Sequence, residues 1–217
     1  MPLMHPSELG RPHHRLRNPL QTGVLYQFRQ PLYDFYGVTV ATVATLQKLF
    51  TIPQGQSYTP AGGAALAKSA WHTNMNAAGQ LPSPQKHYAK GLSLSLRSDV
   101  AAIDAIRFLN DTIVSFFIGG RTYLDLHAMR VPQSGGPYGF SSALITNGLP
   151  VAQNFFELVG DLGEIVEQLQ SFRVELDPTK VIDAAALTTF TTATTANGGF
   201  GINAFVYVDG ILNREVQ

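Results

Sequence analysis

Cysteine is absent from the 217 residues of this chain. Without thiols, the chain can form no disulfide, no cysteine-ligated metal centre and no thiol nucleophile. Charge is scarce too: only 14% of the residues are charged, whereas a typical soluble domain has about 25%. A surface with so few charges is either polar and uncharged, rich in Ser and Thr, or covered in part by other protein. The composition leaves both readings open.

Net charge and long apolar runs are also lacking. The 15 basic residues balance the 15 acidic residues, so the formal net charge is zero. A protein that works alone on nucleic acid is usually basic, whereas zero net charge permits self-association because copies repel little. The chain has no run of about 18 apolar residues that could span a membrane. Its first 20 residues lack the apolar core of a signal peptide.

Residues 1–22 differ in character from the rest of the chain. They contain four prolines, which break regular structure, and three arginines against a single glutamate. We expect an extended N-terminal arm, followed by one domain over residues 23–217. The arm is either a disordered terminus or a segment that orders on a neighbouring subunit or an anionic surface.

Strands are predicted wherever apolar and polar residues alternate. The clearest examples are "GLSLSLR" (91–97), "SFRVEL" (171–176) and "INAFVYVDG" (202–210), with a further one at "LQKLFTI" (46–52). A period of two places one face of a strand in the core and the other outside, which is typical of antiparallel sheets. We therefore expect Leu92, Leu94 and Leu96 inside and Ser93 outside.

Helical signals are few. The segment 99–111 predicts a short helix with Ile103, Ile106 and Leu109 on its buried stripe and Asp99 as its N-cap. The segment 152–169 has helical spacing interrupted by two glycines, so its structure stays open.

Taken together, these signals predict an all-β sandwich or jelly roll of about eight antiparallel strands, with long loops, a short helix and an extended N-terminal arm.

The pair Gly119-Gly120 lies between two apolar runs in "TIVSFFIGGRTYLDL" (112–126). A phosphate-binding loop would need a lysine at a fixed spacing and a following helix, and both are missing here. Two glycines between two strands predict instead a two-residue hairpin turn with positive φ. The hairpin register predicted from this turn sets Phe117 opposite Thr122, Ser115 opposite Leu124 and Ile113 opposite Leu126.

Both faces of this hairpin would then be mostly apolar. A sandwich core covers one face only, so a loop, a helix or another subunit would have to cover the second face. The solvent exposure of Phe116 and Phe117 tests this hypothesis, because a fully exposed side chain at either position would refute it.

Catalytic patterns are missing from the sequence. It has no H-x-x-x-H or H-E-x-x-H metal motif, no G-x-S-x-G nucleophile elbow and no suggestive pair of carboxylates. We therefore expect no enzyme activity, no cofactor, no metal and no small-molecule substrate.

Three segments resemble a known family. "HTNMNAAGQLPSPQKHYAKGLSLSL" (72–96), "SFRVELDP" (171–178) and "INAFVYVDGILNREVQ" (202–217) are similar to parts of the jelly-roll coat proteins of tailless icosahedral bacteriophages. The resemblance covers residues 40–217 loosely, through short motifs. It implies a jelly roll of two four-stranded sheets, and the length suits a single rather than a double jelly roll.

The resemblance further implies a structural capsid protein of the virion that is assembled in the host cytoplasm and contacts copies of itself and other virion proteins. The arm could also meet the genome or an internal membrane. The expected interface comprises the aromatic segment 24–36, the loops 53–85 and 130–150, and the arm. Its candidate residues are Arg11, Arg15, Arg17, Tyr26, Phe28, Tyr33, Phe35, Tyr36, Trp71, Phe116 and Tyr123.

Two alternatives stay open. The chain could be a phage tail or head-decoration protein. It could also be a carbohydrate-binding jelly-roll module, which would need exposed aromatic side chains beside polar ones, with Trp71 and Tyr58 as candidates.

Overall fold

The structure is a computed structural model of the whole chain. It describes residues 24–39, 45–60, 62–97, 100, 102–132, 137–141, 144–147, 155–158, 164–178 and 200–216. The predicted arm, with Arg11, Arg15 and Arg17, and the predicted N-cap Asp99 lie outside these residues.

The larger sheet is built around one long C-terminal strand. β14 (Phe200–Val216) pairs with β1 and β2 on one side and with β6 on the other, and β6 continues to β11 and β12. All these pairs are antiparallel. The remaining strands of this sheet are β1 (Val24–Arg29), β2 (Leu32–Thr39), β6 (Lys86–Leu96), β11 (Phe156–Glu157) and β12 (Glu164–Val166).

The smaller sheet has the strand order β3-β13-β7-β8. Its strands are β3 (Gln47–Leu49), β13 (Phe172–Asp177), β7 (Ile113–Ile118) and β8 (Arg121–His127), and all its pairs are antiparallel. Two short hairpins lie outside both sheets: β4 (Ser57–Tyr58) with β5 (Leu66–Ala67), and β9 (Pro137–Ser141) with β10 (Leu144–Asn147).

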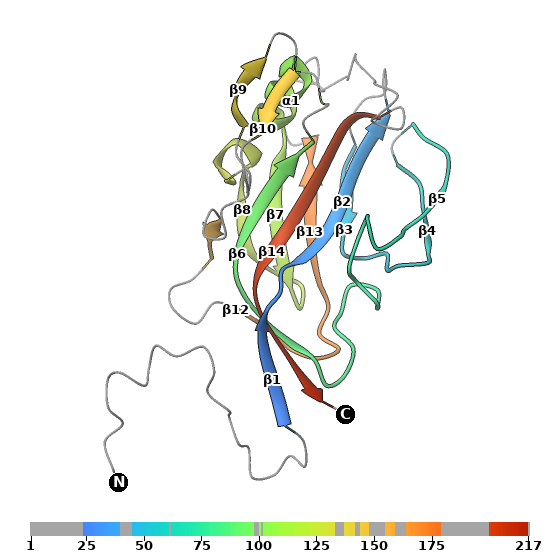
Figure 1. Cartoon of the computed structure of the whole chain (residues 1–217), viewed down its shortest axis with the longest axis vertical. Coiled ribbons are helices and arrows are strands. Elements are labelled where there is room, and N and C mark those ends of the chain that lie inside the picture. Colours follow the sequence, from blue (N-terminus) through green and yellow to red (C-terminus); the bar gives the residue numbers. More distant parts are fainter. Residues whose placement is uncertain are drawn as a thin grey trace, which may run out of the picture.

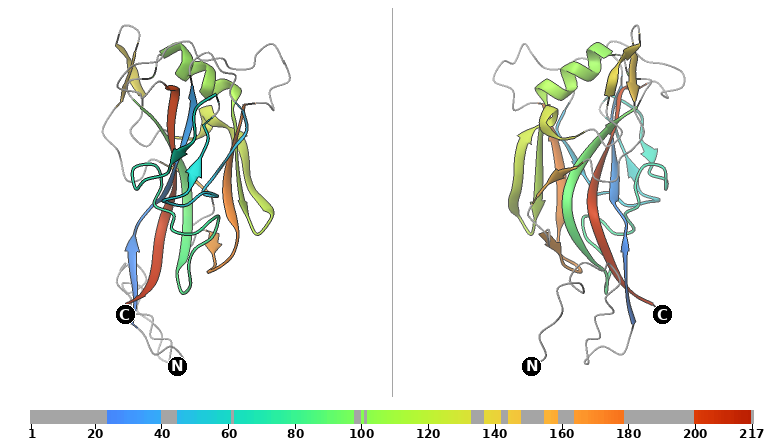
Figure 2. Two further views of the ribbon diagram at one scale, coloured as in Figure 1. Left: turned by 90° about the vertical axis from the view of Figure 1, so that its right-hand side faces the viewer. Right: turned by 60° about the vertical axis from the view of Figure 1, so that its left-hand side comes forward.

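The two sheets lie against each other as two layers, which Figure 2 shows from the side. One buried cluster joins their inner faces, with Leu94 and Val206 from the larger sheet and Phe116 and Val174 from the smaller one. The helix α1 (Ala102–Asp111) lies across one end of the layers, while β1 and the C-terminus lie at the other end (Figure 1). α1 is the one α-helix among the described residues, so the all-β prediction is confirmed.

The alternation predicted for 91–97, 171–176 and 202–210 is confirmed for the apolar residues. Leu92, Leu94 and Leu96 are buried, and the apolar positions predicted for β13 and β14 are buried as well. Ser93 is the exception, because it was predicted to lie outside and is buried. Its hydroxyl donates to Asp209 Oδ2 at 2.9 Å, so a polar partner on the neighbouring strand satisfies it.

The prediction for 46–52 placed Leu46, Phe50 and Ile52 on one face and is wrong, because Leu46 is exposed while both Leu49 and Phe50 are buried.

The stripe predicted for the helix is wrong in two of its three residues. α1 buries Ala105, Phe108 and Leu109, whereas Ile103 and Ile106 are exposed. The predicted and the observed sets of buried residues both have helical spacing, but only the observed set includes an aromatic side chain. The Phe108 side chain is fully buried and packs on the ring of Tyr36 at 5.3 Å between centroids. Burial of this larger apolar area orients the helix.

The segment 152–169, left open by the sequence, contributes β11 and β12 to the larger sheet in the part that the structure describes. Both strands pair with β6, at Leu92 and at the stretch from His87 to Ala89. Gly91 of β6 lies opposite Glu157 of β11, and a Cβ atom there would come within 2.1 Å of the Phe155 ring. The close approach of this segment therefore requires glycine at that position.

The glycine pair between β7 and β8 forms the predicted turn. Gly119 has φ 56° and Gly120 has φ 84°, and Phe117 lies opposite Thr122 as expected. Beyond that pair a β-bulge shifts the register by one residue, so Phe116 lies opposite Leu124 and Ser115 opposite Asp125. The predicted pairs of Ser115 with Leu124 and of Ile113 with Leu126 are therefore wrong.

The bulge also changes what the two faces of the hairpin carry. Leu124 and Leu126 pack against the core with Phe116. On the outer face, Ser115 donates to Asp125 Oδ1 at 2.7 Å, and the Arg173 guanidinium lies 4.2 Å from the centroid of the Phe117 ring. Phe116 is buried and Phe117 is partly buried, so neither position refutes the hypothesis of a covered second face, and Arg173 of the same chain lies over the Phe117 ring.

We expect the left-handed conformation of Gly120 to make this position sensitive to substitution. A Cβ atom there would meet nothing within 4 Å, so the cost comes from the backbone alone. Gly120→Val should lower the free energy of unfolding by about 1–2 kcal/mol, and Gly120→Asn by less, because Asn tolerates positive φ. Urea unfolding of the three proteins measures both values. Equal stability of the Val variant and the parent would contradict the turn.

Candidate interaction surface

The structure separates the predicted interface residues into three groups. Tyr26, Trp71 and Tyr123 expose 53%, 48% and 39% of their surfaces. Phe28 and Tyr33 are partly buried. Phe35, Tyr36 and Phe116 are at most 1% exposed, so their prediction as interface residues is corrected: they belong to the interior of this chain.

Part of the predicted interface loop 53–85 covers β2 of its own chain. The ring of Phe35, on the outer side of β2, is surrounded by the rings of Tyr58, Trp71 and His72 at 6.1, 5.4 and 5.3 Å. Asn74 fastens the segment further, since its side-chain amide donates to the Pro31 carbonyl at 2.9 Å and its oxygen accepts from the Tyr33 N–H at 2.9 Å. The loop therefore buries Phe35 of the segment 24–36 within this chain.

A buried ion pair lies beneath this cover. Lys68 Nζ is 2.5 Å from Asp34 Oδ1, and the two side chains are at most 2% exposed. The backbone N–H of Phe35 donates to Oδ1 at 2.9 Å, and that of Phe50 donates to Oδ2 at 2.5 Å. Burial raises the pKa of Asp34, and Lys68 and the two backbone donors oppose this rise.

No sequence signal pointed to this pair. Asp34 lies within an apolar stretch and Lys68 within a loop, 34 residues later. They meet because the segment after β5 runs along the free edge of β2, where Thr73 forms an isolated bridge with Asp34.

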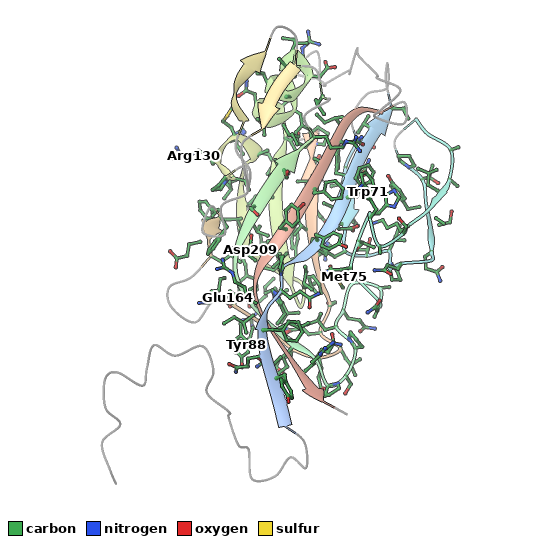
Figure 3. The ribbon with its side chains drawn as sticks, viewed as in Figure 1. Trp71, Met75, Tyr88, Arg130, Glu164 and Asp209 are labelled. Atoms are coloured by element: carbon green, nitrogen blue, oxygen red, sulfur yellow. The ribbon has the colours of Figure 1, made fainter. Side chains whose placement is uncertain are left out.

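Four rings on the outer side of β2 and β14 form what we call the aromatic face: Tyr33, Trp71, Phe205 and Tyr207. Trp71 contacts Phe205 at 5.0 Å between centroids, and Tyr207 lies 6.3 Å from Phe205 and 6.2 Å from Tyr33. Figure 3 shows Trp71 at the β2 side of the larger sheet and Asp209 farther toward the β1 end. Phe205 and Tyr207 were not among the predicted interface residues, although they are the non-core positions of the strand predicted at 202–210.

Charged and polar groups border the aromatic face. The Arg97 guanidinium lies 5.6 Å from the centroid of the Trp71 ring, within cation–π range. Ser93 and Asp209, hydrogen-bonded to each other, lie on the strands beside Tyr207. Burial raises the pKa of Asp209, opposed by this hydrogen bond and by Arg29. Apolar rings beside satisfied polar groups are typical of a surface that binds other molecules.

Other faces of the molecule also expose large apolar side chains. At the α1 end, Ile103 and Met129 of the short helix η2 (Ala128–Arg130) are each about half exposed, and α1 packs against η2. Ile165 and Leu169 are exposed beside β12. Exposed apolar groups thus occur on several sides of the molecule rather than in one patch.

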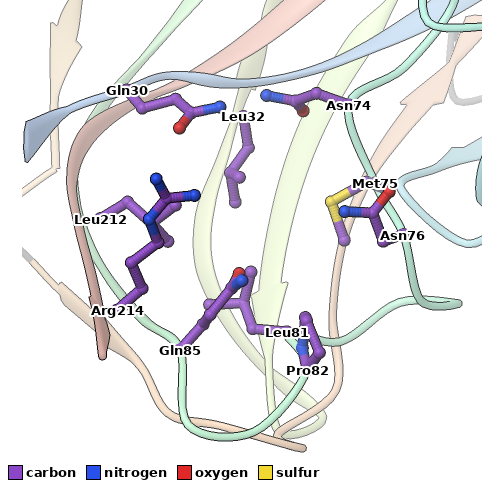
Figure 4. Close-up of a pocket in the computed structure, with 10 residues that line it drawn as sticks. All are labelled: Gln30, Leu32, Asn74, Met75, Asn76, Leu81, Pro82, Gln85, Leu212 and Arg214. Carbon is purple, nitrogen blue, oxygen red and sulfur yellow. The ribbon is translucent and has the colours of Figure 1, made fainter. Parts of the chain in front are cut away.

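A small cavity lies between Gln30 and Leu32 at the start of β2, the end of β14 and the segment 74–85 (Figure 4). Its volume is about 100 Å³, well below the roughly 300 Å³ or more of a typical ligand pocket. Amide groups and the Arg214 guanidinium surround its leucine side chains, and that guanidinium also lies 5.0 Å from the Phe28 ring centroid. The cavity has room for a few waters or one small side chain.

His87 is the buried histidine of β6. One ring nitrogen, Nε2, lies 3.1 Å from the Gln30 carbonyl and donates to it in the neutral ring, while Nδ1 has no hydrogen-bond partner. Burial lowers the pKa of His87 to about 4, opposed by the hydrogen bond to Gln30. His87 is therefore a neutral core residue near pH 7.

Metal-binding clusters and membrane-spanning helices are both missing from the described residues. In the part of the chain that the structure describes, no group of three or more His, Asp or Glu side chains is placed to hold a metal ion. No helix within the described ranges is both long and apolar enough to cross a membrane.

Comparison with known proteins identifies no relative. No family model matches the chain, and neither a curated protein nor a solved structure does.

The lowered pKa of His87 predicts a loss of stability in acid. The neutral ring is favoured in the folded state, so its contribution is fully present above pH 6.5 and is lost as the pH falls from 6.5 to about 4. The loss should reach about 3 kcal/mol in the free energy of unfolding. His87→Gln retains a donor for Gln30 but does not titrate, and should flatten this part of the pH profile. An unchanged slope in the variant would contradict this role of His87.

Proposed function

We propose that this chain is a jelly-roll coat protein that assembles with copies of itself into an icosahedral viral shell. Two observations support the proposal. One is the nested pairing of its strands, which bears on the fold. The other is the distribution of exposed apolar side chains, which bears on self-assembly and carries the functional claim.

The strand pairs are nested like those of one long hairpin. β2 pairs with β14, β3 with β13, β6 with β12 and β7 with β8, so each later pair lies inside the earlier one along the chain. Rolling this hairpin over brings β14 beside β6 in one layer and β13 beside β7 in the other. Eight strands wound in this way make a jelly roll, an architecture that viral coat proteins, lectins and cupins share.

The surface favours assembly over a single binding site. Contiguous exposed apolar patches mark interaction surfaces, and a monomeric binding module needs only one of them. Here, large apolar groups are exposed at the α1 end, at the β7–β8 bulge, beside β12 and on the aromatic face. A shell subunit needs neighbours on several sides, and permanent interfaces bury some 2,000 Å² or more in total. The low charge content and zero net charge leave little to oppose these contacts.

The arm completes the proposal. Residues 1–22 precede β1, which lies at the end of the layers opposite α1. Their arginines would meet an acidic surface of a neighbouring subunit, of another virion protein, of the genome or of an internal membrane. With three arginines, a contribution from phosphate contacts would be modest.

A carbohydrate-binding module is the second candidate, favoured by the aromatic face. Trp71 is half exposed, and it lies with Tyr33 and Tyr207 beside the hydrogen-bonded pair Ser93–Asp209. Flat rings beside hydrogen-bonding groups suit the apolar faces and hydroxyls of sugars. Tyr58, the other candidate from the sequence, is buried and cannot contribute a binding surface.

Light scattering on the purified full-length chain tests assembly. We expect large particles whose formation depends on protein concentration. Ile103→Asp places a charge on the exposed α1 face and should raise the concentration needed by about tenfold. Asn110→Asp, exposed on the same helix, adds the same charge outside the apolar group and should change little.

A strictly monomeric chain at every concentration and salt would overturn the assembly proposal. If that monomer binds glycans on an array and Trp71→Ala abolishes the binding, the second candidate replaces the first.

A further inference from the structure

The contact between Lys68 and Asp34 has the geometry of a reacting pair. Nζ of Lys68 lies 2.5 Å from Oδ1, in a site from which water is almost fully excluded. Burial raises the pKa of Asp34 in spite of the neighbouring amine, which favours its uncharged form. A neutral amine and a neutral carboxylic acid are the two partners that an amide-forming condensation requires.

The backbone around the pair is held in an unusual conformation. Phe50 has φ 68°, a left-handed value that bulky residues rarely adopt. Its ring is fully buried and packs on Phe172 at 5.6 Å, which holds the residue in place. In this conformation its N–H donates to Asp34 Oδ2. Rare backbone conformations of this kind cluster at functional sites, and a fixed N–H donor of this kind stabilises a developing oxyanion.

The Tyr58 ring lies next to the pair. Lys68 Nζ is 5.2 Å from the centroid of the Tyr58 ring, whose hydroxyl is buried without a hydrogen-bond partner. Burial raises the pKa of Tyr58, and so does the nearby Asp34. The other titratable neighbour is His72, whose pKa is lowered by burial and by Lys68.

We propose that Lys68 and Asp34 form an intramolecular isopeptide bond. The Nζ lone pair attacks Cγ of Asp34, and Oδ2 takes up negative charge opposite the Phe50 N–H. The Nζ–Cγ bond forms and the Cγ–Oδ1 bond breaks. Oδ1 leaves as water with its own proton and one from Nζ. The reaction is a condensation and needs no oxidant or reductant.

The bond would join β2 covalently to the segment after β5. β2 is an edge strand of the larger sheet where it pairs with β14, and the Lys68 segment lies along its free side. A chain without cysteine would thereby gain a covalent link between distant positions, which restricts the unfolded state as a disulfide does. The inference does not depend on the proposed coat function.

Intact-mass spectrometry of the denatured full-length protein tests the proposal. We expect a mass about 18 Da below that of the sequence, the mass of one water, and a branched tryptic peptide that joins residues 34 and 68. Lys68→Arg keeps the positive charge but removes the attacking amine, so its mass should equal that of its sequence. Asp34→Asn should lose ammonia instead, about 17 Da.

Two results would overturn the proposal. A wild-type mass equal to that of the sequence would leave Lys68 and Asp34 as an ion pair only. A loss of water that persists in Lys68→Arg would place the reaction elsewhere, for example as a succinimide at Asp209-Gly210. The branched peptide is sought in the wild-type protein, so the test does not require any variant to fold.

Discussion

The position of β14 between β2 and β6 is the constraint on which the rest of the fold depends. This one strand bonds to the beginning of the described chain through β1 and β2 and to its middle through β6. Once the two ends of the hairpin are joined in this way, the inner strands are drawn into a second layer beneath, and their apolar residues close the core. The strands that make the core are thus joined by contacts between residues far apart in sequence, which form late and at a high entropic cost.

Among the described elements, β2 has one edge without a neighbouring strand. β2 has β14 on one side, and on the other side the only regular pairing in the described structure is a single bridge to Thr73. Exposed edges promote unwanted strand pairing, and proteins usually cover them. Here the cover is the segment that carries Lys68 and Trp71, held by a buried ion pair and a cluster of rings. The same segment presents the aromatic face to the outside, so the local fold and the candidate surface have one origin.

The sequence predicted the structural features that depend on local periodicity, but not those that depend on contacts with residues far away in the chain. The alternation in β6, β13 and β14 and the turn at Gly119-Gly120 are local, and the structure confirms them. The buried face of α1 depended on the contact of Phe108 with Tyr36, a residue far away in the sequence. The register of β8 depended on a β-bulge that leaves no signature in the amino-acid composition. Trp71 and Tyr123 are exposed, as an interface would require. Phe35 and Tyr36 are aromatic as well, but their side chains are buried. Aromatic content alone cannot separate a core from an interface.

Self-assembly is the central claim of this account, and electron microscopy of the purified full-length protein at high concentration tests it most directly. Apolar groups on several sides, few charges and nested strands together predict closed particles of uniform diameter. A field of dispersed single subunits under all buffer and salt conditions would contradict the account. Open filaments of variable length would contradict its closed symmetry, because a heterologous contact that fails to close gives a fibre rather than a shell.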